Sequence, residues 1–303
     1  MPWYDSFDTL CKERFPVMEV LREEPMSLHT TMRVGGPAKR LARPGSIEEL
    51  TALLDAAEAE DWLYMLLGNG SDLLVADEGL PLLVIHTGRL SNVENAGERG
   101  LRAQAGVPLA RFAAAAQQRA LTGLEFAHGI PGTLGGAVMM NAGAYGGEMA
   151  DVIRSVLAWF PGEGVRELAP EELYFGYRHS LFSEKRGVVL EALVELAPGD
   201  GEEIKAKMAD LMARRREKQP LDMPSAGSTF KRPPNAFAAA LIDQCGLRGT
   251  RVGGAQVSEK HAGFVVNAGG ATCRDILALM ELIRETVLRE TGISLEPEVK
   301  LVP

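Results

Sequence analysis

Residues 129–147 read GIPGTLGGAVMMNAGAYGG, a stretch of 19 residues that holds seven glycines. A tight turn needs only one or two glycines, so this density requires another cause. Glycine has no Cβ atom, which lets backbone N–H groups approach a phosphate and surround it. We therefore expect this segment to lie against a flat or charged ligand.

Two shorter segments, RVGGPA at 33–38 and GNGSDL at 68–73, suit either the same purpose or a simple turn. Neither is a familiar nucleotide motif. A P-loop needs a Gly-Lys pair, which occurs nowhere in the chain, and a Rossmann fingerprint needs a third glycine where Leu73 stands. A dinucleotide would have to bind by another arrangement of backbone amides.

Helical patterns surround these segments. Capping-box spacing predicts helix starts at Ser46 with Glu49 and at Thr272 with Asp275. Further helices are expected from Pro108 to Ala120, over about 202–218, and on the surface within the first 25 residues. The helix that ends before Gly292 has one apolar face, formed by Ile276, Leu279, Met280, Ile283 and Val287.

Apolar runs between the helices predict strands, at 63–67, 82–85, 152–160, 187–196 and 294–302. In the last of these, alternation puts Glu296 and Glu298 on one face, so spacing does not distinguish them. Alternating helices and strands indicate an α+β protein with α/β alternation.

The composition is that of an ordinary globular protein, with 46% hydrophobic and 24% charged residues among 303, enough for two or three domains. A net charge of −9 argues against a nucleic-acid partner. Cys11, Cys245 and Cys273 have no metal-ligand spacing and suit a reducing compartment. No apolar run reaches the ~20 residues needed to span a membrane, and the N-terminus does not read as a signal peptide. We expect a cytoplasmic monomer with no metal and no membrane or nucleic-acid partner.

Seven segments occur in the order found in the UDP-N-acetylenolpyruvoylglucosamine reductases, which the chain resembles from about Ser27 onward. They are TTMRVGGPA (30–38), LGNGSDLLV (67–75), GIPGTLGGAVMMNAGAYGGE (129–148), YRHSLF (177–182), PSAGSTFKRP (224–233), VSEKHAGFVVN (257–267) and LEPEVKLV (295–302). The short stretch after Tyr177 and Arg178 resembles the compact subgroup of that family.

The resemblance implies two FAD-binding subdomains of the vanillyl-alcohol-oxidase type and a C-terminal α+β substrate-binding domain. The corresponding ranges are 1–88, joined by a terminal strand at 296–303, then 89–218, and 219–295. It also implies FAD as cofactor. His29, His86 and His128 do not stand in the context of a flavin-linked histidine, so we expect the FAD to be non-covalent.

The three glycine-rich loops match the family's cofactor-binding segments. The residues carried over are Arg33, Val34, Gly35, Gly36, Gly68, Asn69, Gly70, Ser71, Asp72, Leu73, Gly129, Ile130, Pro131, Gly132, Thr133, Gly135, Gly136, Ala137, Asn141, Ala142, Gly143 and Gly146. An acidic side chain does not face phosphate directly, so for Asp72 a ribose contact or a turn role is expected.

The implied reaction uses NADPH to reduce UDP-N-acetylglucosamine enolpyruvate to UDP-N-acetylmuramate, a step of peptidoglycan precursor synthesis and so of cell-wall biogenesis. Hydride passes from flavin N5 to the vinyl carbon. By resemblance, Ser228 is the proton donor, Arg178 binds the substrate carboxylate, and Glu298, the acid directly before Val299, positions a water or proton or orients Arg178. From local sequence alone, Ser228 would be a turn serine and Arg178 a surface arginine.

Five further residues are candidate contacts for the nucleotide sugar: Tyr145, Tyr177, Lys231, Lys260 and His261. A UDP-sugar carries two phosphate charges, so basic groups must converge on it. The tyrosines suit a core role equally well. Two alternatives are a different FAD-linked oxidoreductase of the same fold, and a flavin- or nucleotide-binding protein without catalysis. The segments AGSTFKRP and VSEKHAGFVVN argue against the first, and the presence of Arg178, Ser228 and Glu298 argues against the second.

Overall fold

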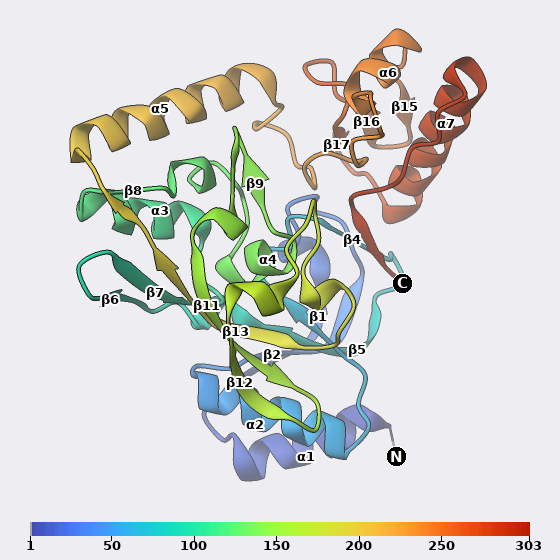
Figure 1. The fold of residues 1–303 in the computed structure, drawn as a ribbon. Helices are drawn as coiled ribbons and strands as arrows, with labels where there is room; N and C mark the ends of the chain where they lie inside the picture. Colours follow the sequence, from blue (N-terminus) through green and yellow to red (C-terminus); the bar gives the residue numbers. More distant parts are fainter. Residues whose placement is uncertain (1) are drawn as a thin grey trace. The chain divides into compact units, whose positions relative to one another are not determined.

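The computed structural model describes residues 2–303, which cluster into two compact units (Figure 1). Unit 1 comprises the chain up to Leu21, Arg40–Asn69 and Leu82–Arg214, and unit 2 comprises Arg22–Lys39, Gly70–Pro81 and Arg215–Pro303. Within the described chain, no helix has both the length and the apolar character that crossing a membrane requires.

Unit 1 contains a five-stranded antiparallel sheet in the order β12-β11-β13-β7-β6 (Figure 1). Its strands are β6 (Val93–Ala96), β7 (Gly100–Gln104), β11 (Ile153–Phe160), β12 (Gly164–Leu168) and β13 (Val188–Glu195). Helices α3 (Leu109–Gln118) and α4 (Leu134–Met139) share its core through the fully buried Phe112, Leu134 and Val138. The sequence predicts Pro108 as the first residue of α3, but Pro108 is its N-cap, so the helix begins one residue later, at Leu109.

A second sheet has the order β1-β2-β5-β3. Its strands are β1 (Glu19–Pro25), β2 (Pro37–Arg43), β3 (Tyr64–Leu67) and β5 (Leu80–His86). Helix α2 (Ile47–Ala59) begins where the capping box predicted it, with the Ser46 hydroxyl accepting a bond from the Glu49 amide at 3.1 Å. Helix α1 (Trp3–Arg14) is present as expected, but its Phe7 is completely buried, so α1 contributes to the core.

Unit 2 combines a three-stranded antiparallel sheet with two helices. Its elements are β15 (Arg251–Val252), β16 (Ala255–Val257), β17 (Val265–Asn267), α6 (Ala238–Gln244) and α7 (Cys273–Thr291). All five residues predicted for the apolar face of α7 are buried, and Gly292 ends the helix with a left-handed φ of 72°. The predicted capping box of Thr272 and Asp275 is also confirmed.

The predicted final strand is much shorter than expected. Only β18 (Lys300–Val302) pairs as a strand, in parallel with β4 (Leu73–Val75). Pro297 interrupts the longer run because proline has no N–H for a ladder, and it makes only an isolated bridge with Phe230. The alternation argument for Glu296 and Glu298 was therefore wrong, since neither lies in a strand.

The remaining elements are short, apart from one long helix. They are β8 (Leu121–Thr122), β9 (Gly143–Ala144), β10 (Gly147–Glu148), β14 (Ala197–Pro198), α5 (Gly201–Lys218) and the 3₁₀ helices η1 (Met26–Leu28), η2 (Thr87–Arg89), η3 (Glu125–Ala127), η4 (Met149–Asp151), η5 (Pro170–Leu173) and η6 (Leu181–Ser183). The three-domain division stays a prediction.

Candidate active site

The glycine run of unit 1 packs its first half against the residues before α3. The amide of Leu134 donates to the Val107 carbonyl at 2.9 Å, and that of Gly135 donates to the Ala105 carbonyl at 2.8 Å. A Cβ added at Gly135 would lie 2.9 Å from the Cβ of Ala105. Close chain packing therefore accounts for part of the glycine content.

Gly68 and Asn69 lie directly beside this run. The Asn69 side-chain amide donates to the Pro131 carbonyl at 2.8 Å, and a Cβ at Gly68 would lie 2.4 Å from the Thr133 hydroxyl oxygen. Gly68 and Asn69, the part of the second glycine-rich segment that belongs to unit 1, thus lie against the glycine run.

Several polar groups in these segments lack the partners that folding normally provides. Among the described residues, no acceptor is recorded for the amides of Asn69, Gly70 and Ser71, although Gly70 is buried. The Nδ1 atom of His128, next to the glycine run, is likewise buried without a hydrogen bond in the described chain. Buried polar atoms are nearly always paired, so the Gly70 amide and the His128 Nδ1 atom fit a polar ligand such as the phosphates of a dinucleotide, with the amides of the exposed Asn69 and the half-buried Ser71 beside them.

The segment 31–36 of unit 2 leaves no space for side chains at its glycines. A Cβ at Gly36 would lie 2.1 Å from the Asp77 carbonyl oxygen. The Thr31 hydroxyl donates to the Ser225 carbonyl at 2.6 Å, and the side-chain amide of Asn267 donates to the Met32 carbonyl at 3.2 Å. This loop is therefore bonded to the segment that carries Ser228.

Arg178 stands at the tip of a two-residue turn in unit 1. Gly176 and His179 close the turn with reciprocal backbone bonds of 3.0 and 3.2 Å. Arg178 has a left-handed φ of 53°, and its guanidinium lies over the exposed ring of Tyr177 at 5.3 Å. A non-glycine residue in this conformation costs about 1–3 kcal/mol and is typical of functional sites.

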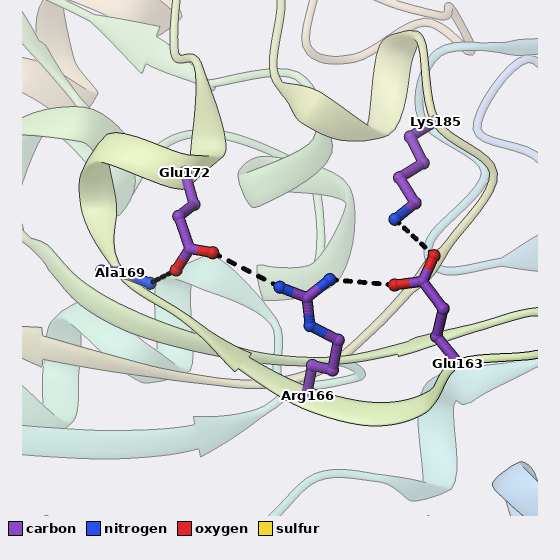
Figure 2. A network of polar contacts seen from close by, with 5 residues as sticks. All are labelled: Glu163, Arg166, Ala169, Glu172 and Lys185. Atoms are coloured by element: carbon purple, nitrogen blue, oxygen red, sulfur yellow. Dashed lines mark hydrogen bonds and ion pairs between the residues drawn. The ribbon is translucent and has the colours of Figure 1, made fainter.

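Residues before and after this turn, in 163–172 and at Lys185, are joined by the network of polar contacts in Figure 2. Arg166 of β12 pairs with Glu163 at 2.9 Å and with Glu172 at 3.5 Å, and Glu172 also accepts from the Ala169 amide at 2.8 Å. Lys185 pairs with Glu163 at 2.6 Å. Hydrogen bonds from Lys185 and Arg166 lower the pKa of the Glu163 carboxyl, which keeps the network ionised.

Ser228 and Glu298 lie near each other along two bonded backbones of unit 2. Ser228 is exposed, and its neighbour Thr229 is buried. Thr229 donates its amide to the Gly263 carbonyl, accepts the Val265 amide at its hydroxyl, and accepts the Glu298 amide at its carbonyl, each at 2.9 Å. Glu298 is half-buried, whereas Glu296 is exposed and pairs with Lys231. Their environments favour Glu298 over Glu296.

Lys260 and His261 follow the buried Ser258, whose hydroxyl accepts both of their amides at 3.2 and 3.3 Å. The Nδ1 atom of His261 accepts the Gly263 amide, so the ring proton sits on Nε2. Burial lowers the pKa of His261. Lys260 also borders a cavity of about 490 Å³ in unit 2, together with Arg216 and Arg251.

The candidate residues fall into two sets. Unit 1 holds the glycine run with Tyr145, and the turn with Tyr177 and Arg178, while unit 2 holds Arg33–Gly36, Ser228, Lys231, Lys260, His261 and Glu298. Sequence reasoning missed Thr31, Thr229 and Asn267, which bond to the segments of the candidate residues. All three lie inside the quoted motifs, and that position was the only available signal.

Comparisons with known proteins agree with these features. Residues 219–302 match the family model described as UDP-N-acetylenolpyruvoylglucosamine reductase, C-terminal domain, and residues 38–168 match an FAD binding domain. The UDP-N-acetylenolpyruvoylglucosamine reductase of Caldanaerobacter subterraneus subsp. tengcongensis is 48% identical, with 94% of this chain and 96% of the relative covered. That of Geobacillus kaustophilus is 46% identical, with 99% and 97% covered.

A solved structure gives the same result for the fold. The reductase of this name from Thermus caldophilus superposes with a TM-score of 0.79 at 37% identity, with 94% of this chain and 99% of that chain covered. An alkyldihydroxyacetonephosphate synthase, with a TM-score of 0.50 at 20% identity over 64% of this chain and 44% of that one, shares the fold alone. The predicted FAD-binding fold is thereby confirmed, and the chain belongs to the UDP-N-acetylenolpyruvoylglucosamine reductase family.

Proposed function

We propose that this protein uses NADPH and non-covalently bound FAD to reduce UDP-N-acetylglucosamine enolpyruvate to UDP-N-acetylmuramate, a precursor of peptidoglycan. The observation that carries the proposal is identity of 44–48% to reductases of this name over nearly the full chain. An FAD-binding model matches residues 38–168, a range that includes the glycine run. When bound, FAD supplies a carrier that takes two reducing equivalents from NADPH and passes them to the substrate.

The glycine-rich loops would hold that cofactor through backbone groups. The amides of Asn69, Gly70 and Ser71, which have no acceptor among the described residues, suit phosphate oxygens, because successive backbone N–H groups can surround an anion. The buried, unbonded Nδ1 of His128 is a further polar atom next to the run. These features support a cofactor role for the loop 68–71 and for the backbone of the glycine run.

Reduction of the enolpyruvyl group saturates its double bond, with one hydrogen added at each carbon. As the terminal carbon gains its hydrogen, negative charge develops on the carbon that bears the carboxylate. Arg178 suits this charge because a guanidinium stays ionised and bonds a carboxylate with two parallel N–H groups. The left-handed turn fixes the direction from which its side chain leaves the backbone.

Ser228 would then protonate the carbon next to the carboxylate. A hydroxyl is a weak acid, so it must be held close to a strongly basic carbon centre. The buried Thr229 supports this, because its three backbone and hydroxyl bonds fix the position of the adjacent Ser228 while Ser228 itself remains exposed. Glu298, bonded through its amide to Thr229, would position a water or a proton at the same carbon.

Basic groups near the cavity of unit 2 suit the phosphates of the nucleotide. Lys260 borders it with Arg216 and Arg251. Lys231 pairs with Glu296 at the surface, and exposed ion pairs contribute only about 0–1 kcal/mol, so a phosphate can displace Glu296. Tyr145, exposed at the tip of the β9–β10 hairpin, and Tyr177 remain candidates for substrate contact.

A two-step anaerobic absorbance experiment tests the function. NADPH should bleach the flavin band near about 450 nm, and UDP-N-acetylglucosamine enolpyruvate should then restore it. UDP-N-acetylglucosamine, which lacks the enolpyruvyl double bond, is the control and should restore nothing. Bleaching without recovery would reject the substrate, and a protein that takes up no FAD would reject the cofactor.

We also propose that the enzyme acts in the cytoplasm as a monomer, with subdomains at 1–88, 89–218 and 219–295. Three unpaired cysteines support a reducing compartment. Light scattering of the purified protein should give the mass of one chain, 32.7 kDa. A mass twice that value would reject the monomer.

A further inference from the structure

Asn141 lies in the glycine run predicted to contact FAD, yet its side chain is buried and bonded to the protein at both of its polar atoms. It is 1% exposed. Its Oδ1 accepts the Ala150 amide at 2.9 Å, and its Nδ2 donates to the Gly176 carbonyl at 3.1 Å. A backbone N–H can only donate, so the atom facing Ala150 must be the oxygen, which leaves the nitrogen for Gly176.

Gly176 is the base of the turn that presents Arg178. Its carbonyl accepts from both Asn141 and the His179 amide, the bond that closes the turn. The left-handed φ of Arg178 is a strained conformation, which persists only where the surrounding contacts hold it. The bond from Asn141 is such a contact.

A second bond reaches the other side of the same turn. Ser180 is completely buried, and its hydroxyl donates to the Met139 carbonyl at 2.7 Å. Met139 ends α4, two residues before Asn141. The turn is therefore held on both sides by one short stretch of chain, 139–141.

We propose that Asn141 is a positioning residue for Arg178, with Ser180 as the second anchor, and is not a contact of the flavin. The inference rests on the proposed function of Arg178. Asn141 is 1% exposed, so almost none of its surface is open to a cofactor, and each polar atom of its side chain already has a partner within the protein.

Asn141→Asp tests this, because the two side chains have nearly the same shape. The introduced carboxyl can still accept from Ala150. When ionised, its second oxygen faces the Gly176 carbonyl and repels it, and when protonated it donates to that carbonyl as the amide did. Burial raises the pKa of such a carboxyl, so lowering the pH toward about 6 should protonate it.

We expect Asn141→Asp to bind FAD and to be bleached by NADPH as the unaltered protein is. Reoxidation by the enolpyruvyl nucleotide should be slower by about 10–100-fold near pH 8, since small misplacement of a catalytic group has this effect. The rate should recover relative to the unaltered protein as the pH falls toward about 6. Asn235→Asp is the matched control. Both asparagines have a left-handed φ, 42° at Asn141 and 58° at Asn235, but Asn235 is exposed.

Hydrogen–deuterium exchange supplies a readout that does not depend on activity. Amides of residues 174–182 should exchange faster in Asn141→Asp near neutral pH, and in Ser180→Ala at every pH, while those of α3 do not change. If Asn141→Asp fails to fold, Ser180→Ala tests the inference instead. It should show the same faster exchange at 174–182 and the same slower reoxidation by the enolpyruvyl nucleotide.

Weaker FAD binding with normal reoxidation would overturn the inference and make Asn141 a cofactor contact. A pH profile parallel to that of the unaltered protein, with unchanged exchange at 174–182, would also overturn it. If the unaltered protein is not reoxidised at all, the proposed function fails, whereas faster exchange in the variants would still support the anchoring of the turn.

Discussion

The Glu298 amide donates a hydrogen bond to the Thr229 carbonyl at 2.9 Å. This bond joins the residue after Ser228 to the candidate acid near the end of the chain. Through it, two side chains that are far apart in sequence belong to one local structure of unit 2. Each of the two has a neighbour of the same residue type in a different environment, Ser225 for Ser228 and Glu296 for Glu298, which can serve as its control.

Ser228→Ala should separate the two half-reactions. Bleaching by NADPH should remain within about twofold, while reoxidation by the enolpyruvyl nucleotide should slow by about 10²–10⁴-fold, the usual contribution of a general acid. Stopped-flow absorbance measures both. Ser225→Ala is the control, since the bonds of Ser225 among the described residues, to Thr31 and in a bridge with Val266, are made by its backbone. Equal slowing of both steps would mean that Ser228 serves folding or cofactor placement.

Arg178→Lys should retain the positive charge but lose the paired N–H groups. Reoxidation should slow by about 10–100-fold, because a hydrogen bond to a charged group contributes about 1.5–3 kcal/mol. Arg154→Lys is the control, since Arg154 is an exposed arginine of unit 1 that pairs with Glu195 at 3.7 Å. Normal kinetics in Arg178→Lys would argue that Arg178 binds no carboxylate.

Thr229→Val should lower the free energy of unfolding by about 1–3 kcal/mol, since it leaves the buried Val265 amide without an acceptor. Thr229→Ser keeps the hydroxyl and should lose much less. Urea denaturation followed by circular dichroism gives both values. If valine and serine were equivalent here, the hydroxyl would not support this part of unit 2.

His261 should make the protein less stable in mild acid. Burial lowers its folded-state pKa below the ordinary value of 6.5, so the unfolded chain binds the proton more readily. The free energy of unfolding should therefore fall as the pH drops through 6.5 and continue to fall down to the folded pKa. His261→Asn, which can still accept the Gly263 amide, should flatten this slope. An unchanged slope in urea titrations would assign the effect to other groups.

The cysteines should differ sharply in reactivity. Burial raises the pKa of Cys11 to about 12 and that of Cys273 to about 11. Cys245 is only half-buried. Iodoacetamide near pH 8 should therefore label the native protein slowly and at Cys245 alone, whereas urea should expose three sites. Mass spectrometry of peptides locates the label, and modification of native Cys11 would contradict its burial.

Local chemistry determined most of what the sequence predicted correctly. Ser46 and Thr272 begin helices because their side chains cap amides three residues away, and α7 follows from its apolar face. The partners of Asn141 and Thr229 depend on tertiary contacts, which no spacing rule contains. The left-handed φ of Arg178 is equally hidden, since arginine rarely adopts it. The break at Pro297 was predictable, because proline in a presumed strand argues against that strand.

The parallel pairing of β18 with β4 has a consequence during synthesis. Strand β4, at Leu73–Val75, directly follows the loop 68–72, and its neighbour in the sheet is Lys300–Val302. On a ribosome, β4 must wait for all the intervening residues, roughly 10–45 s at ordinary elongation rates. Its open edge is exposed to misfolding and to chaperones throughout that interval. The loop 68–72 beside it, proposed to hold the cofactor, is completed only once Lys300–Val302 have been made, so uptake of FAD at this loop should follow the synthesis of β18.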